Sequence, residues 1–318
     1  MNLVEALKSI GEHTRLRVLA LLAHGELSVG ELVDVLGISQ PRLSRHMKFL
    51  TAAGLVERLP EGAWVFYRLP AKGHARDLID AILPFVPETS PEFKRDLDHL
   101  RGVKQARSKA AEDYFNALAD NWDDVRGRHY PADAVEAGLL NAAGAGPFPF
   151  MVDLGTGTGR MMTLFHERVD RAEGIDLSHK MLNLARTNLE RAGAQNASVR
   201  FGDVTALPFD DGVADLITLH QVLHYMDRPE RVIDEAARIL APNGRLLIVD
   251  FAPHQQEFLR TEYEHRHLGL SDEELRTWTE ASGLSLQPPV RFDPTDEHGL
   301  SVSIWAADKR SEAGEKAA

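Results

Sequence analysis

The feature that most constrains this chain is a glycine-rich turn, Asp153-Leu154-Gly155-Thr156-Gly157-Thr158-Gly159. The apolar run before it, 150–154, is typical of a buried strand, and residues 160–164 after it are typical of a helix. Glycines let the backbone turn sharply and pass close to a ligand. The start of the helix offers unpaired N–H groups to a negatively charged group. We therefore expect a strand, a ligand-binding turn and a helix in succession.

Short apolar runs continue this pattern along the C-terminal half. They occupy residues 172–176, 214–219 and 245–250, and helical segments separate them. Strands that alternate with helices predict a parallel α/β sheet. Residues 300–305 alternate between apolar and polar side chains, which is typical of an edge strand.

The N-terminal part has a different pattern. Apolar residues recur at helical spacing in residues 3–23 and 28–37, and a third helix follows Ile38-Ser39-Gln40-Pro41, with Ser39 as its N-cap. Residues 55–69 then predict two short strands around a turn that contains Gly62. Three helices and a hairpin are the order of a winged helix-turn-helix, which is mainly α with a β-hairpin wing.

These patterns divide the chain into four parts. We expect a DNA-binding domain over 1–87, a helical linker and cap over 88–147, a ligand-binding α/β domain over 148–308 and a disordered tail over 309–318.

The charge distribution agrees with this division. The 318 residues carry a formal net charge of −12, but residues 1–85 have one positive charge in excess. No Asp or Glu lies between Asp34 and Glu57, and that stretch contains Arg42, Arg45, His46 and Lys48. A basic stretch without acids favours contact with nucleic-acid phosphates.

Composition also limits the chemistry and the compartment. The chain has no cysteine, which excludes disulfides and thiolate metal sites. It shows no signal sequence and no apolar run of about 18 residues, the length that would suggest a membrane span. We expect a cytoplasmic protein without membrane contact.

The glycine turn resembles motif I of the class I methyltransferases that use S-adenosylmethionine (SAM). The dinucleotide fingerprint needs its third glycine where this chain has Arg160. Three further elements agree with the methyltransferases: Asp176 at the end of the next strand, Gly202-Asp203-Val204 after the third strand, and the turn 240–246 before strand five. The resemblance covers residues 110–308 and is closest to the ubiquinone-biosynthesis-like branch. It implies a Rossmann-like α/β fold.

The same resemblance implies a site for SAM or for its product S-adenosylhomocysteine (SAH). Asp153 and the glycines would contact the methionine moiety, Asp176 the ribose, and Asp203 with Val204 the adenine. The full set of expected contacts is Asp153, Gly155, Thr156, Gly157, Gly159, Asp176, Leu177, Met181, Gly202, Asp203, Val204 and His220.

No residue stands out as a catalyst, because positioning alone can supply much of the rate of methyl transfer. His220 and His224 follow the fourth strand, where they could hold an acceptor or a base, or be ordinary residues that border the ligand. Their spacing is that of two metal ligands on a helix, but Gln221 replaces the usual glutamate and we expect no metal. For Glu264-His265-Arg266-His267 we expect a solvated surface rather than a cover over the site.

The third predicted helix resembles the recognition helix of the ArsR family of bacterial repressors. The resemblance implies contacts with a double-stranded DNA operator by Ser39, Gln40, Arg42, Ser44, Arg45, His46 and Lys48, and by Arg58 and Arg68 on the wing. Metal-sensing members carry two cysteines where this chain has Ser28 and Gly30, so metal sensing is not expected.

ArsR-type proteins bind DNA as dimers, which implies a homodimer. The candidate interface residues are Leu3, Leu7, Leu78, Ile79 and Ile82, which could equally belong to the core.

Two functions remain open. One is a transcription regulator whose C-terminal domain senses SAM or SAH. The other is an active small-molecule methyltransferase with an attached DNA-binding domain. A DNA methyltransferase is disfavoured, because the chain lacks an Asn-Pro-Pro-Tyr type motif and its C-terminal part is acidic.

Overall fold

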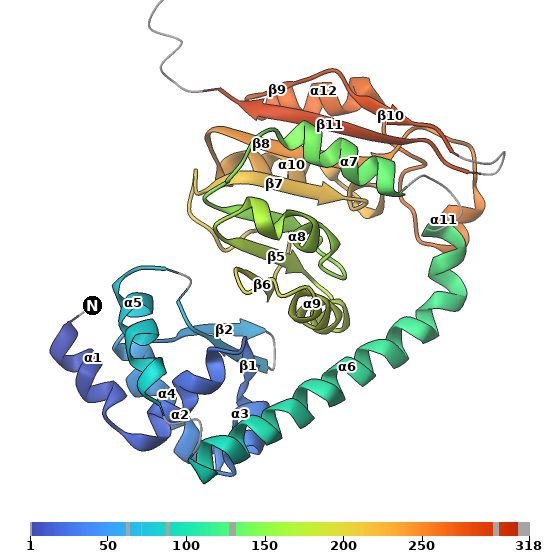
Figure 1. The fold of residues 1–318 in the computed structure, drawn as a ribbon. Helices are drawn as coiled ribbons and strands as arrows, with labels where there is room; N and C mark the ends of the chain where they lie inside the picture. Colours follow the sequence, from blue (N-terminus) through green and yellow to red (C-terminus); the bar gives the residue numbers. More distant parts are fainter. Residues whose placement is uncertain are drawn as a thin grey trace, which may run out of the picture. The chain divides into compact units, whose positions relative to one another are not determined.

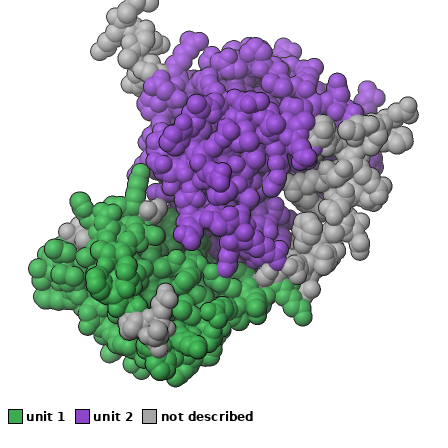
Figure 2. Space-filling view, viewed as in Figure 1, with its two compact units in different colours: residues 1–111 green, residues 112–318 purple. Residues whose placement is uncertain are grey.

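The computed structural model describes residues 2–61, 64–70, 72–86, 90–126, 132–294 and 299–310. The chain divides into two compact units, residues 1–111 and 112–318 (Figure 2). Figure 1 shows their helices and strands. Among the described residues, no helix combines the length and the apolar character needed to cross a membrane.

The first unit is a winged helix-turn-helix. Its helices are α1 (Leu3–Ile10), α2 (His13–Leu22), α3 (Val29–Leu36), α4 (Gln40–Ala52), α5 (His74–Ile82), the short 3-10 helix η1 (Leu83–Phe85) and the first part of α6 (Pro91–Arg126). Strands β1 (Leu27–Ser28), β2 (Glu57–Glu61) and β3 (Trp64–Arg68) form an antiparallel sheet in the order β1-β3-β2. The predicted order of helices and hairpin is therefore present.

Local signals define the helix-turn-helix. Ser28 and Glu31 form a capping box at the start of α3, and Gly37 ends this helix in the left-handed region with φ of 64°. Leu43, Met47 and Leu50 of α4 are buried in the core of the unit, which leaves the opposite face of α4 exposed.

The start of α6 belongs to this core. Leu100 packs in the same apolar cluster as α2 and α4, and Phe93 is buried near it on α6. The Arg17 guanidinium donates from Nε and Nη2 to the two oxygens of Asp96, at 2.6 and 2.7 Å, and from Nη1 to Glu92 at 2.8 Å. Both Arg17 and Asp96 are buried. The first turns of α6 are therefore fixed to the helix-turn-helix by a buried ion pair.

The second unit contains an eight-stranded sheet. The parallel strands lie in the order β6 (Ala197–Phe201), β5 (Ala172–Asp176), β4 (Met151–Leu154), β7 (Ala214–His220) and β8 (Leu240–Phe251). Antiparallel β11 (Val302–Lys309) follows β8 and pairs with β10 (Val290–Phe292) and β9 (Leu284–Leu286). This is the predicted Rossmann-like arrangement.

Apolar clusters cover both faces of this sheet. One contains side chains of α10 (Pro229–Ile239) and α12 (Asp272–Ala281), and the other contains side chains of α7 (Ala132–Ala143), α8 (Arg160–Phe165) and α9 (His179–Arg191). The shorter elements are η2 (His166–Arg168), η3 (Leu223–Tyr225) and α11 (Phe258–Glu262). A parallel sheet buried on both faces explains why its strands are nearly continuous apolar runs.

Two details differ from the sequence expectations. The predicted edge strand at 300–305 overlaps β11 from Val302 onward. Strand β11 has neighbours on both sides, and its Trp305 is fully buried. The turn expected over 240–246 is taken into β8, which begins at Leu240 and has an irregular register opposite Ala214 and Leu216. Most of the predicted tail, residues 311–318, lies outside the described residues, whereas Lys309 pairs with Leu284.

Candidate ligand site at the glycine turn

The glycine turn joins β4 to α8 at the carboxyl ends of the parallel strands. Gly155 has φ of 69°, and a Cβ there would lie 2.5 Å from the side chain of Val222. A Cβ at Gly157 would meet no atom closer than 4.0 Å. Gly155 is thus required by packing, while the backbone at Gly157 faces open space in which a ligand can lie against the main chain.

Asp153 is fully engaged within the protein. Its Oδ2 accepts a hydrogen bond from the Thr156 hydroxyl and its Oδ1 one from the Thr218 hydroxyl, both at 2.6 Å. Burial raises the pKa of Asp153 to about 6, although the two hydroxyl groups oppose this effect. Asp153 therefore shapes the glycine turn and also lines the pocket beside it.

Asp176 ends β5, next to β4, and lies half-buried beside the same turn. Its Oδ2 accepts a hydrogen bond from the Gly157 N–H and its Oδ1 one from the Ser178 N–H, both at 2.8 Å. Burial raises the pKa of Asp176, and the backbone N–H groups oppose this shift. The carboxylate is held in a fixed orientation and can still accept from further donors.

The remaining predicted contacts lie at the ends of β5 and β6. Leu177 follows β5 and exposes 56% of its surface. The Gly202 N–H donates to the Asp176 carbonyl at 3.1 Å, Asp203 is exposed and accepts from Thr205, and Val204 is buried. The adjacent strands β5 and β6 thus bring together the residues predicted for ribose and adenine.

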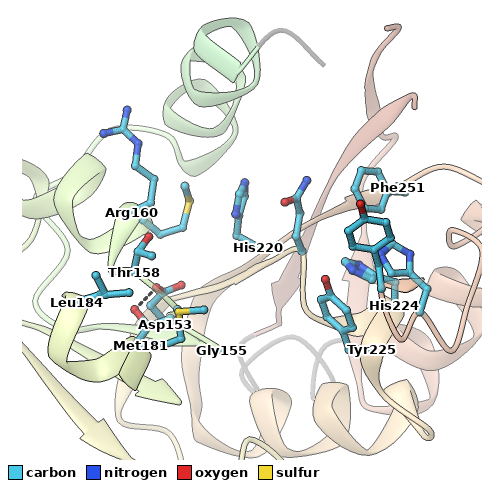
Figure 3. Close-up of a pocket in the computed structure, with 16 residues that line it drawn as sticks. Asp153, Gly155, Thr158, Arg160, Met181, Leu184, His220, His224, Tyr225 and Phe251 are labelled. Atoms are coloured by element: carbon cyan, nitrogen blue, oxygen red, sulfur yellow. Dashed lines mark hydrogen bonds between the residues drawn. The ribbon is translucent and has the colours of Figure 1, made fainter. Parts of the chain in front are cut away.

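A pocket extends from the glycine turn along the ends of β7 and β8 (Figure 3). The glycine turn, Met181 and Leu184 lie at one end, and His224, Tyr225 and Phe251 at the other, with His220 between them. Predicted residues that line it are Asp153, Gly155, Thr156, Gly157, Met181, His220 and His224. Gly159, Asp176, Leu177, Gly202, Asp203 and Val204 are not among its lining residues.

The other residues that line the pocket are not predicted from the sequence: Thr158, Arg160, Met161, Leu184, Gln221, Tyr225, Phe251, Tyr263 and His265. The expectation of a solvated surface at 264–267 was wrong for His265, which is buried. Tyr263 and His265 line the pocket from the segment after β8. No sequence pattern distinguishes this segment from a surface loop.

His224 and Asp250 form a buried pair at the far end of the pocket. The Nδ1 atom of His224 lies 2.6 Å from Oδ1 of Asp250. The N–H groups of Phe251 and His224 also donate to this carboxylate, at 2.8 and 3.3 Å. Burial alone would raise the pKa of Asp250, but His224 and the two N–H groups outweigh it and hold the pKa below its ordinary value. Asp250 is therefore ionised at neutral pH.

Aromatic rings surround this pair. The rings of His224 and His265 lie 4.2 Å apart, and those of His224 and Tyr225 lie 4.0 Å apart. Burial and the nearby His224 lower the pKa of His265 to about 4, so that its ring is neutral at pH 7. The described part of the chain holds no group of three or more His, Asp or Glu side chains arranged for a metal ion.

In the first unit, the predicted DNA contacts lie mainly on one face of α4. Ser39, Gln40, Arg42, Ser44, Arg45 and Lys48 are exposed there, and Arg58 is exposed on β2. His46 is half-buried, with Nδ1 3.2 Å from a Glu12 oxygen, and burial lowers its pKa. The Arg68 guanidinium donates to Glu57 at 2.7 Å. These two side chains therefore each lie against an acidic side chain of the same unit.

The fold is that of a class I methyltransferase domain that follows a winged helix-turn-helix. Residues 152–248 match the family model of the methyltransferase domain, and residues 12–58 match that of the bacterial regulatory proteins of the arsR family. The chain thus joins an ArsR-family helix-turn-helix to a methyltransferase domain, and the fold class predicted from the sequence is confirmed.

Curated relatives match the C-terminal domain. A demethylmenaquinone methyltransferase of Thermus thermophilus is 38% identical over 107 residues, which are 32% of this chain and 47% of that protein. Its counterpart from Deinococcus radiodurans is 31% identical over 160 residues, 48% of this chain and 64% of that protein. The chain spans about half to two thirds of the length of these relatives, whose activities are properties of those enzymes.

Solved structures share the fold at low identity. The cyclase SpnF has a TM-score of 0.52 at 17% identity, over 62% of this chain and 94% of that one. A geranyl diphosphate C-methyltransferase of Streptomyces coelicolor has a TM-score of 0.50 at 20% identity, over 56% of this chain and 76% of that one. One neighbour is a cyclase and the other a methyltransferase, so the fold alone does not determine the reaction.

Proposed function

We propose that this protein is a DNA-binding transcription regulator whose methyltransferase domain binds SAM or SAH as its regulatory ligand. The observation that carries the proposal is the Asp176 carboxylate, which the Gly157 N–H holds beside the glycine turn. A fixed carboxylate with lone pairs to spare can accept hydrogen bonds from both hydroxyls of a ribose. The open space at Gly157 leaves room for the ligand against the backbone.

The exposed face of α4 supports the DNA-binding part of the proposal. Arg42, Arg45 and Lys48 lie on that face, and the acids nearest in the sequence are Asp34 and Glu57. Cations on a recognition helix can contact phosphates, and Gln40 and Ser44 can donate to base edges. A ligand changes DNA affinity only if it binds the DNA-competent and incompetent forms with different affinity.

The experiment has two stages. Calorimetry measures the binding of SAM and SAH to the protein and to Asp176→Ala, with the exposed Asp210→Ala as matched control. Loss of a charged hydrogen-bond acceptor costs about 1.5–3 kcal/mol, so we expect Asp176→Ala to weaken binding about 10-fold to 100-fold and Asp210→Ala to leave it unchanged. DNA selected from a random pool is then titrated with ligand-free and ligand-saturated protein. Equal DNA affinity in all states would refute regulation by these ligands.

We also infer a homodimer. Leu3 and Leu7 of α1 expose 55% and 46% of their surfaces, whereas Ile79 of α5 is buried in the core of its own unit. Leu78 and Ile82 are half-buried. The exposed apolar face of α1 is therefore the favoured interface, and a symmetric dimer would bind two DNA half-sites.

A second candidate function is methyl transfer to a small molecule. Bound SAM would supply an electrophilic methyl group, and the pocket continues beyond the glycine turn to the pair of His224 and Asp250. Its test is turnover: labelled SAM, below the concentration that saturates the protein, is incubated with a metabolite extract. A labelled product must appear with the protein and be strongly reduced with Asp176→Ala. Absence of any product with SAM-binding protein would exclude this function for the compounds present.

A further inference from the structure

Several polar atoms near the far end of the pocket have no hydrogen-bond partner among the described residues. They are Nε2 of His224, Nδ1 of His265, Nε2 of His254 and Nε2 of Gln221, and all four atoms are buried. An unsatisfied buried polar atom costs about 1–3 kcal/mol, so such atoms are rare unless a ligand or water completes them. His224, His265 and Gln221 all line the pocket. The clustering of these unpartnered polar atoms at one end of the pocket indicates a site for a polar group of a ligand.

The contact between His224 and Asp250 determines which nitrogen of the imidazole is available. An ionised carboxylate can only accept hydrogen bonds, so Nδ1 of His224 carries a proton toward Asp250. In the neutral ring, Nε2 then has the free lone pair. A histidine whose Nδ1–H is held by a buried carboxylate is the arrangement of a general base, because the carboxylate stabilises the imidazolium that forms.

The surroundings restrict the chemistry of the bound molecule. Tyr225, Phe251 and Tyr263 line this end of the pocket with aromatic rings. Arg160 is the one arginine or lysine among the lining residues, and its Nε donates to Glu136 at 2.7 Å. A phosphate or carboxylate would therefore lack a free cation here, whereas a neutral, flat molecule with a hydroxyl group would fit.

We propose that the far end of the pocket binds a neutral phenol-type acceptor, with Nε2 of His224 as the atom that takes the hydroxyl proton and Asp250 as its positioning residue. The inference rests on the proposed SAM binding. In the transfer, the acceptor oxygen forms a bond to the methyl carbon while the carbon–sulfur bond breaks and its electron pair stays on sulfur. The hydroxyl proton moves to His224, so the positive charge passes from the sulfonium to the imidazolium beside Asp250.

The test begins without turnover. The full-length protein, saturated with SAH, is titrated with 2-naphthol and with its methyl ether, which lacks the hydroxyl donor. Imidazole ¹⁵N spectra of the same samples report the tautomer of His224. We expect 2-naphthol to bind at least 10-fold more tightly than the ether and to shift the Nε2 resonance of His224. Asp250→Asn should change the tautomer of His224 while SAH still binds.

Turnover with labelled SAM and 2-naphthol completes the test. A general base contributes about 100-fold to 10,000-fold to a rate, so His224→Gln should lose at least 100-fold. The matched control is His166→Gln, on η2 and not among the residues that line the pocket.

Each outcome decides the proposal. Equal or absent binding of the two naphthalenes, or an unchanged His224 resonance, would overturn it even if His224→Gln failed to fold, because these measurements use the unaltered protein. Full activity of a folded His224→Gln would also overturn it. If SAH binds and changes DNA affinity but 2-naphthol does not bind, the acceptor site is refuted and the regulatory proposal stands. If neither SAM nor SAH binds, both fail.

Discussion

The buried pair of Arg17 and Asp96 offers a sharp test of how the winged helix-turn-helix unit is held together. Arg17 exposes 9% of its side chain and Asp96 3%, and two hydrogen bonds of 2.6 and 2.7 Å join them. Breaking a buried pair by removing one partner costs about 3–5 kcal/mol, because the other charge stays buried. Glu92 remains 2.8 Å from Arg17 and compensates part of the loss, so we expect Asp96→Asn to destabilise this unit by about 3 kcal/mol.

The chain supplies a matched control on the same helix. Asp98 forms a 2.7 Å ion pair with Arg101, but these side chains are 50% and 72% exposed. An exposed pair contributes about 0–1 kcal/mol, so Asp98→Asn should have a small effect. Denaturant unfolding followed by circular dichroism measures both variants. Hydrogen exchange of α2 and the start of α6 then locates the loss, which for Asp96→Asn should appear as faster exchange in both segments.

A double variant separates charge from packing. Replacement of a buried ion pair by apolar residues of similar size is often neutral or stabilising. We therefore expect Arg17→Met with Asp96→Leu to recover most of the stability that Asp96→Asn loses. If Asp96→Asn and Asp98→Asn lose the same free energy of unfolding, within about 0.5 kcal/mol, the reasoning from burial is refuted.

Three further predictions address charge and association. The folded pKa of Asp153, about 6, lies above its ordinary value of 3.8, so this one group should contribute a loss of about 3 kcal/mol of stability to the ligand-free protein as the pH rises from about 4 to 6. Asp153→Asn should remove this contribution, which appears as the difference between the two proteins in denaturant titrations, and identical pH profiles would contradict it. Arg45→Ala should weaken DNA binding and reduce the steepness with which the logarithm of the DNA-binding constant falls with the logarithm of the salt concentration, by about 1. The control Lys94→Ala, on α6, should leave both quantities unchanged. Equal salt dependence of the unaltered protein and the two variants would argue against a phosphate contact by Arg45. Leu7→Glu should shift the mass in analytical ultracentrifugation from dimer to monomer, and a dimer that persists would remove α1 from the interface.

Much of the fold could be predicted because its signals are local. The capping box at Ser28, the glycine that ends α3 and the apolar spacing of α4 each act within a few residues. The strand that ends at Leu154 and the glycine turn after it likewise depend on neighbours in the sequence. These elements follow the predicted order, and the parallel strands carry the predicted residues at their carboxyl ends.

The far end of the pocket could not be predicted, because it depends on contacts between distant segments. His224 follows β7, Asp250 lies at the end of β8 and His265 comes from the segment after it. No periodic pattern relates three such positions, so the importance of His224 remained open and His265 was assigned to the surface. For His46 and Arg68 the sequence likewise shows their charge, but not the Glu12 and Glu57 side chains that face them, and their contact with DNA stays a prediction.

The junction between the two units has a consequence for how such a protein can be recombined. The start of α6 supplies Phe93, Asp96 and Leu100 to the interior of the helix-turn-helix unit. A cut at residue 87, where the sequence suggests a domain boundary, would leave Arg17 without Asp96 and open the apolar interior to water. A gene fusion that joins this helix-turn-helix unit to a different domain must therefore retain the first turns of α6. The segment that must be transferred is longer than residues 12–58, which match the family model.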